Sequence, residues 1–233
     1  MVSNNPKGRS PEIIMEREEE YRKKGQKLFN CSNDQIWVTG ILDKEFEYSH
    51  ETKGTKFYSS TVMITRTSDV VDHIPILVSE DKISNGEFKK YTAVKVAGSL
   101  RTLKTVSIFN FIQASLLEKD EDESRDTDEN ILHLQGFVSN PPHFVKTKLG
   151  KKILYIVLEV SIRGRRSYIS CMLWDNKAEK AKDEIEEGDK VEVYGSVQSR
   201  IHRMEDKERP GKDIEITKYE ISVCKYNIMR KNS

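Results

Sequence analysis

Two stretches in the C-terminal part of the chain, residues 155–163 and 168–174, place an apolar side chain at every second position. The apolar members of this alternation are Ile156, Leu158, Val160, Ile162, Ile169, Cys171 and Leu173. A period of two over this length is typical of strands with one buried face. Each stretch therefore predicts a strand whose apolar side chains face a core.

The residues that follow predict a helix and two more strands. Residues 178–187 carry apolar side chains at helical spacing and end at a Gly-Asp turn. Residues 191–203 and 214–228 predict two strands joined by a charged turn that contains Pro-Gly. With a first strand over 130–136, the chain has five strands and a helix between the third and fourth. This is the order of the OB-fold, a small Greek-key barrel.

The N-terminal part of the chain repeats this pattern. Residues 34–40 align with 130–136 at an offset of 96, and 94–100 align with 191–197 at an offset of 97. A nearly constant offset over separate blocks indicates two copies of one domain. Glycines recur after the first and fourth strands of both copies, where a barrel sheet must bend sharply.

We therefore expect an all-β protein of two tandem five-stranded OB-fold barrels, of which the second carries the short helix. The expected division is an N-terminal extension (1–33) with a helix over 11–28, a first OB domain (34–117), an acidic linker (118–129), a second OB domain (130–228) and a tail (229–233).

Composition limits the class of protein. Of the 233 residues 36% are apolar and 33% are charged, which suits small domains with much exposed surface. No apolar run is long enough to cross a bilayer, and the first 20 residues lack the apolar core of a secretory signal. The three cysteines are scattered and odd in number, so we expect neither a disulfide framework nor a paired-cysteine zinc site. These features favour a cytoplasmic protein that makes no contact with membranes.

The net charge of +1 conceals an uneven distribution. Residues 118–129 hold eight acidic and two basic residues, whereas residues 130–233 hold 20 basic and 15 acidic ones. A block of like charges repels itself and cannot be buried, so we interpret 118–129 as a solvated spacer. The alternative is that this segment competes with a polyanion for the basic surface.

Aromatic and cationic side chains gather on the predicted outer face of the second copy. Tyr155, Tyr168 and Trp174 occupy outward positions on paired strands, as does Met172. The cations around them are Lys151, Lys152, Arg163, Arg165, Arg166, Arg200, Arg203, Lys207 and Arg209. Rings bordered by cations suit a single nucleic-acid strand, whose bases stack while its phosphates follow the basic groove. Each ring taken alone could equally be an ordinary strand residue that covers a neighbour.

The first copy has less stacking capacity. Ser59, His73 and Ser79 stand at the places of Tyr155, Tyr168 and Trp174. Its main outward aromatic is Trp37, which could stack on a base or lie in a contact between the domains.

Several blocks of the second copy resemble the bacterial single-stranded DNA-binding protein family. They are residues 130–136, Gly150, residues 169–174 and residues 188–200, and the first copy shows a weaker version. The resemblance implies OB folds that bind single-stranded DNA by stacking and usually assemble to four OB domains, with Tyr168 and Trp174 at stacking positions. The chain departs from the family in having two OB domains and in ending without an acidic, apolar tip.

We therefore expect single-stranded DNA binding with little sequence specificity, in replication, recombination or repair, by a nucleoid-associated homodimer with four OB domains. The alternatives are a primosome-type OB adaptor that binds replication proteins and an RNA-binding OB protein. We expect no enzymatic activity, cofactor or metal, because the five histidines lack ligand spacing and the chain has no phosphate-binding glycine loop.

Overall fold

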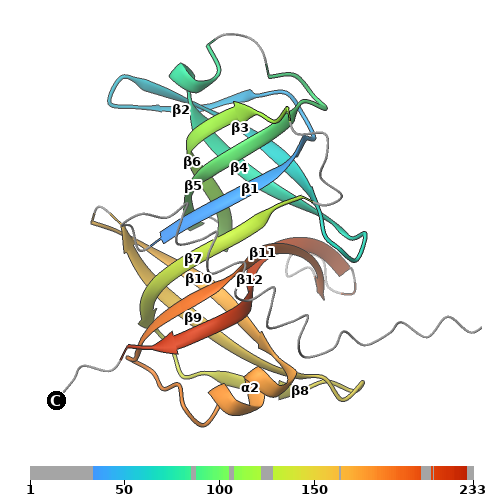
Figure 1. The fold of residues 1–233 in the computed structure, drawn as a ribbon, viewed down its shortest axis with the longest axis vertical. Coiled ribbons are helices and arrows are strands. Elements are labelled where there is room, and N and C mark those ends of the chain that lie inside the picture. Colours follow the sequence, from blue (N-terminus) through green and yellow to red (C-terminus); the bar gives the residue numbers. More distant parts are fainter. Residues whose placement is uncertain are drawn as a thin grey trace, which may run out of the picture.

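The chain folds into strands that join in one twelve-stranded sheet (Figure 1). The computed structural model describes residues 34–84, 88–104, 108–121, 128–162, 164–205, 211 and 213–229. The expected helix over 11–28 lies outside these residues, as do the rest of the N-terminal extension and the tail after Met229. We call the elements up to Lys119 the first half and those from Asn130 onward the second half.

The second half contains the strands that the alternation predicts and one more. Its elements are β7 (Asn130–Val138), β8 (His143–Lys146), β9 (Lys152–Ile162), β10 (Arg165–Trp174), α2 (Asp175–Ala181), β11 (Lys190–Glu205) and β12 (Asp213–Ile228). Strands β7, β9, β10, β12 and β11 pair in this order, and β11 pairs back with β7 to close a five-stranded barrel. Only the short pairing of β10 with β12 is parallel.

The predicted inward face of these strands is confirmed. The core of the second half includes Ile156, Leu158 and Val160 from β9 and Ile169, Cys171 and Leu173 from β10. The expected helix is misplaced, because α2 runs over Asp175–Ala181 rather than 178–187. Ala178, Ala181 and Ile185 are all buried as expected, but Ile185 lies in the turn after the helix. Helical spacing of apolar residues does not distinguish a helix from the tight turns that continue it.

The first half repeats the order of strand pairing. Its elements are β1 (Asp34–Leu42), β2 (Glu47–Thr52), β3 (Thr55–Thr65), β4 (Val71–Ser79), a 3-10 turn η1 (Glu80–Lys82), β5 (Ala93–Lys104) and β6 (Ile108–Lys119). Pairing runs β1–β3–β4–β6–β5–β1, again with one short parallel step, between β4 and β6. Strands β2 and β8 were missed in the sequence: β2 is exposed at all six positions and β8 has no buried residue, so neither shows an apolar alternation.

Glycines stand at the register shifts within the β5–β6 and β11–β12 pairings. The register of β5 on β6 shifts at Gly98, and that of β11 on β12 shifts at Gly195. A Cβ on Gly98 would lie 2.2 Å from the Gln113 carbonyl oxygen, and one on Gly195 would lie 2.3 Å from that of Ser222. Such distances exclude any side chain, so glycine lets the strands approach closely at these bulges.

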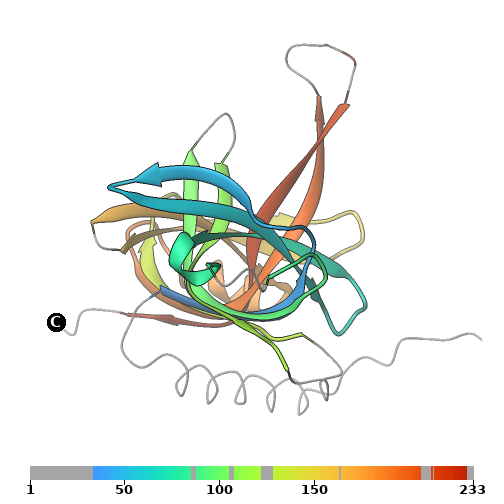
Figure 2. The ribbon, with the colours of Figure 1, turned by 90° about the horizontal axis from the view of Figure 1, so that it is seen from above.

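The two halves meet along their first strands. β1 pairs antiparallel with β7, from Asp34 opposite Leu134 to Val38 opposite Asn130, so the sheet runs continuously through both halves. Two long hairpins, β5–β6 and β11–β12, extend from the halves, and Figure 2 shows the β11–β12 hairpin standing well clear of the rest. We call these hairpins the first arm and the second arm. Thr102 of the first arm and Ser199 of the second arm each contact the opposite half.

Candidate nucleic-acid interface

Trp174 and Tyr155 lie near each other on the outer face of the second half. Trp174 ends β10 opposite Ile153, and Tyr155 lies on β9 opposite Met172. Both rings are partly exposed, whereas the core side chains of the same strands point inward. The expectation that Met172 is exposed on this face is wrong, because its side chain is only 1% exposed. Ile153, on the paired strand, is likewise only 5% exposed. The buried side chains of Met172 and Ile153 therefore lie between the two rings on this face.

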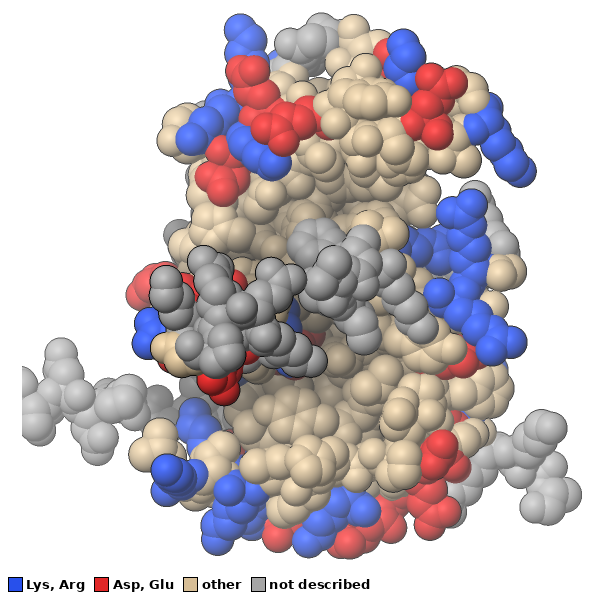
Figure 3. Space-filling view, turned by 180° about the vertical axis from the view of Figure 1, so that it is seen from behind, with Lys and Arg blue, Asp and Glu red and all other residues tan. Residues whose placement is uncertain are grey.

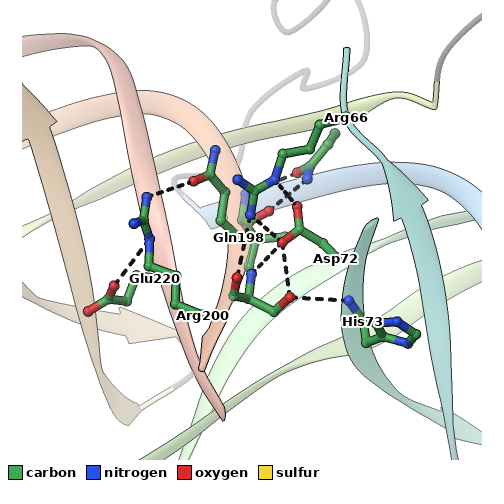
Figure 4. A network of polar contacts seen from close by, with 9 residues as sticks. Arg66, Asp72, His73, Gln198, Arg200 and Glu220 are labelled. Atoms are coloured by element: carbon green, nitrogen blue, oxygen red, sulfur yellow. Dashed lines mark hydrogen bonds and ion pairs between the residues drawn. The ribbon is translucent and has the colours of Figure 1, made fainter. Parts of the chain in front are cut away.

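Arg200 from the second arm covers the ring of Trp174. Its guanidinium carbon lies 4.8 Å from the ring centroid, a distance suited to a cation–π contact. The guanidinium also donates to Gln198 at 3.3 Å and lies 3.8 Å from the buried carboxylate of Glu220 (Figure 4). Arg200 is thus held from two sides, with a third of its side chain still open to solvent.

Tyr168 lies apart from the other two rings. It is six residues from Trp174 along β10, or about 20 Å at strand spacing. Its hydroxyl donates to Glu159 at 3.0 Å, and its backbone carbonyl accepts a hydrogen bond from the Thr102 hydroxyl of the first arm at 3.0 Å. The structure therefore brings Tyr155 and Trp174 together and places Tyr168 at the junction of the halves.

The β8–β9 hairpin adds a histidine and several lysines to this face. His143 stacks on Tyr155 with ring centroids 6.4 Å apart. Lys146, Lys148 and Lys151 are exposed, and none has an ion pair within the described part of the chain. Lys152 instead pairs with Glu179 of α2. The sequence analysis missed His143, Lys146 and Lys148 because they precede the strand predicted over 155–163. The available signal was the presence of four lysines and no acidic residue between positions 143 and 155.

The remaining predicted cations are less uniform. Arg166 lies 3.4 Å from Glu159, and Arg203 donates to Glu215 at 2.9 Å, so acids neutralise both in part. Arg165 is exposed at the far end of β10. Arg163, Lys207 and Arg209 lie outside the described residues. Figure 3 shows Lys and Arg gathered on one side at mid-height, where the halves meet, while both ends of the molecule carry mixed charge.

Trp37 lies at the contact between the halves. It is opposite Ile131 in the β1–β7 pairing, and its indole Nε1 donates to Glu129 at 2.7 Å. This position fits the interpretation of Trp37 as a contact between the halves, and the indole is also partly exposed.

The described ends of the acidic segment are bonded to the first half, contrary to a purely solvated spacer. The backbone amide of Thr65 donates to Asp128 at 2.7 Å, and Lys95 lies 3.1 Å from Asp120. Residues 122–127 lie outside the described part.

A second polar cluster surrounds Glu192 on β11. Its carboxylate accepts hydrogen bonds from His133, Gln135, Tyr194 and Asn227, and the His133 and Tyr194 rings stack at 4.5 Å. Burial acts to raise the pKa of Glu192, but the hydrogen bonds from Asn227, His133 and Gln135 outweigh it and lower this pKa. The Glu192 carboxylate has its hydrogen bonds supplied from within the cluster, which is typical of a structural network.

Neither a metal site nor a membrane span is found in the described ranges. No group of three or more His, Cys, Asp or Glu side chains there could hold a metal ion. Among the same residues no helix has the length and apolar character to cross a membrane.

Residues 133–229 match the family described as OB-fold nucleic acid binding domain (tRNA_anti-codon). This match covers less than half of the chain and coincides with the closed five-stranded barrel of the second half. No curated protein sequence is a significant match.

Two solved structures have a similar fold, both of the single-stranded DNA binding protein from Thermus aquaticus. The wild type and a deletion mutant each give a TM-score of 0.67 at 15% identity over 86% of this chain, covering 94% and 96% of those chains. At this identity the similarity shows the fold alone. The N-terminal domain of PriB protein from Thermoanaerobacter tencongensis matches 39% of this chain and 100% of that domain at 24% identity; its TM-score of 0.37 is too low to support a conclusion.

Proposed function

We propose that the protein binds single-stranded DNA with little sequence specificity, mainly through the outer face of the second half. The observation that carries this proposal is the pair of partly exposed rings, Trp174 and Tyr155, with Arg200 over one and the unpaired lysines of the β8–β9 hairpin beside the other. The match of residues 133–229 to an OB-fold nucleic-acid-binding family and the fold shared with Thermus aquaticus single-stranded DNA binding protein support it.

A flexible single strand offers both unpaired bases and a negatively charged backbone to this surface. Its unpaired bases stack on aromatic rings, which stabilises binding by about 1–3 kcal/mol per base and requires no particular base. Its phosphates follow cations beside the rings, so binding weakens with salt, with a slope of about −0.7 for each phosphate neutralised. A duplex keeps its bases paired and could not reach Trp174 and Tyr155 in this way.

We further propose that both halves are OB domains, in tandem over residues 34–117 and 130–228, and that the protein acts in replication, recombination or repair as part of the nucleoid. The repeated pairing order of the strands supports two copies. So does register: Ser59 lies opposite Leu77 as Tyr155 lies opposite Met172, at the offsets found in the sequence.

A homodimer with four OB domains remains part of the proposal, on the family resemblance alone. A first strand left at an exposed edge would offer a surface for pairing with a second chain, but β1 and β7 pair with each other inside one chain. Light scattering of the purified protein tests this: a mass of two chains supports the homodimer, and a mass of one chain rejects it.

One observation favours an adaptor that binds replication proteins instead. Four of the predicted cations, Lys152, Arg166, Arg200 and Arg203, already lie against acidic side chains, and the net charge is only +1. Ion pairs of this kind reduce the charge available for phosphates.

Titration of the protein with dT and rU oligomers at two salt concentrations separates these functions. Tight, salt-dependent binding of dT with quenching of tryptophan emission supports the proposal. Equal or tighter binding of rU indicates an RNA-binding protein. No change in emission at low salt, confirmed by the anisotropy of labelled oligomers, favours the adaptor.

A further inference from the structure

Ser199 of the second arm is held by the first half through all its polar groups (Figure 4). Its backbone amide donates to Asp72 Oδ1 at 2.6 Å, and its hydroxyl lies 3.0 Å from the same oxygen. The hydroxyl oxygen also lies 3.3 Å from the backbone amide of His73, and the carbonyl lies 3.4 Å from Arg66 Nη2. The contacts fix both peptide units that flank Ser199.

Asp72 is the central residue of these contacts between Ser199 and the first half. Its side chain is 0% exposed, and it accepts two hydrogen bonds from Arg66, at 2.6 Å from Nε and 2.5 Å from Nη2. A buried carboxylate that accepts a bidentate pair of hydrogen bonds from an arginine and hydrogen bonds from two further donors is held strongly and in one orientation. Asp72 and Arg66 belong to the first half, whereas Ser199 belongs to the second.

The residue that follows Ser199 is Arg200, which covers Trp174. The Ser199 carbonyl bonded by Arg66 belongs to the peptide unit that leads into Arg200. Fixing this peptide sets the direction in which the Arg200 side chain leaves the strand. The guanidinium itself is held by its hydrogen bond to Gln198 and by its ion pair with Glu220.

The reciprocal contact of the first arm lacks each of these features. Thr102 occupies the place of Ser199 and bonds Ser167, which stands where the first half has Asp72. The next residue is Leu103, and the ring position of β4 is Ser79. Only one of the two arm contacts therefore combines a buried charge with a cation placed over a ring.

We propose that Asp72 in the first half is a positioning residue for the nucleic-acid site of the second half. It holds Ser199, and through it keeps Arg200 over Trp174, so that the guanidinium is ready to meet a phosphate beside a stacked base. This inference rests on the proposed function. It goes further by assigning part of the binding site of one half to a residue of the other.

The test uses a Trp37→Phe protein, in which Trp174 is the sole tryptophan. Asp72→Asn is compared with Asp43→Asn, which removes the charge from the exposed pair of Asp43 with His73 in the same half. In Asp72→Asn we expect stronger quenching of Trp174 by acrylamide in the free protein, and about tenfold weaker binding of a dT oligomer. In Asp43→Asn we expect neither change.

Arg200→Gln separates positioning from general damage. If Asp72 acts through Arg200, adding Asp72→Asn to Arg200→Gln weakens dT binding no further, because the coupled pair is already broken. An equal loss in both backgrounds, or behaviour of Asp72→Asn like that of Asp43→Asn, overturns the inference.

A milder variant covers the case in which Asp72→Asn does not fold. Ser199→Ala removes only the hydroxyl contacts and should weaken dT binding about threefold, with a matching rise in quenching; no change in either overturns the inference. If the parent protein does not bind dT at all, the proposed function fails, while acrylamide quenching of the free variants still decides whether Asp72 positions Arg200.

Discussion

Where β10 of the second half ends in Trp174 beneath the Arg200 guanidinium, β4 of the first half ends in Ser79, with Leu103 at the place of Arg200. The β8–β9 hairpin of the second half is also more basic than the β2–β3 hairpin of the first half. Residues 143–155 carry four lysines and no acid, whereas the aligned residues 47–59 carry two lysines and two glutamates. One half presents rings and positive charge at positions where the other presents small, polar or neutral side chains.

The features that the halves share are the inward ones. Both have the same order of strand pairing, and both place glycine at the bulge of the strand that enters the arm, at Gly98 and Gly195. Inward side chains and close-packed glycines set the fold, since a change there leaves a cavity or a clash. Outward side chains carry little of the folding free energy, so they are free to differ and to hold the binding surface of one half only.

The largest expected effect comes from removing the rings of the second half. Changing Tyr155, Tyr168 and Trp174 together to Ala should weaken dT binding by about 100-fold or more, because each stacked base contributes about 1–3 kcal/mol. Anisotropy of a labelled dT oligomer measures the loss.

The matched control changes Ser59, His73 and Ser79 of the first half to Ala, and Trp37→Ala serves as a second one. Both should retain nearly full affinity. Losses equal to that of the ring variant would mean that the halves contribute alike.

Next in size is the effect of the lysines of the β8–β9 hairpin. Changing Lys146, Lys148 and Lys151 to Gln should weaken dT binding about tenfold at low salt and lower the salt slope by up to about 2, since each phosphate contact contributes about 0.7. Titrations at four salt concentrations give both values. Lys53→Gln with Lys56→Gln in the first half is the control, and an unchanged slope in the hairpin variant would contradict the assignment.

A smaller effect concerns stability and a buried carboxylate of the first half. Burial raises the pKa of Asp34 to about 7, although Arg101 and a hydrogen bond from the Leu100 amide act in the opposite direction. At the equivalent place in the second half, Asn130 both accepts from the Val197 amide at 3.0 Å and donates to its carbonyl at 2.7 Å. Ionised Asp34 cannot donate, so its charge is buried with less compensation.

Because the folded pKa of Asp34 lies above its unfolded value of 3.8, this group favours the folded state at low pH. That contribution is lost as pH rises through about 7. Asp34→Asn should therefore raise the free energy of unfolding by about 1 kcal/mol at pH 8 and by much less at pH 4. Urea denaturation at both pH values measures the gain, and a gain independent of pH would contradict this explanation.

The smallest expected effect is a gain of binding in the first half. Ser79→Trp with Leu103→Arg places the ring and cation of the second half on the first half. We expect dT affinity to rise only about threefold, because the hairpin beside the new ring is uncharged overall and lacks the anchored arm. An unchanged affinity would show that ring and cation alone do not make a site.

Sequence alone was sufficient for the barrel strands of the second half, since period-two alternation and glycine positions depend on burial. It failed for β2, β8 and the bounds of α2, because exposed hairpins and short helices leave little apolar pattern. The sequence singles out the rings and Arg200 as candidates, but it does not predict the contact of Arg200 with Trp174, since that depends on where the second arm lies. Asp72 was missed because a single acid carries no signal until the chain folds a buried pocket around it.

The central claim is that bases stack on Trp174 in the second half. It is tested most directly by following the emission of Trp174 in a Trp37→Phe protein while a dT oligomer is added and binding is recorded independently by anisotropy. We predict quenching that saturates together with the anisotropy. Emission that stays constant while the oligomer binds would contradict the claim.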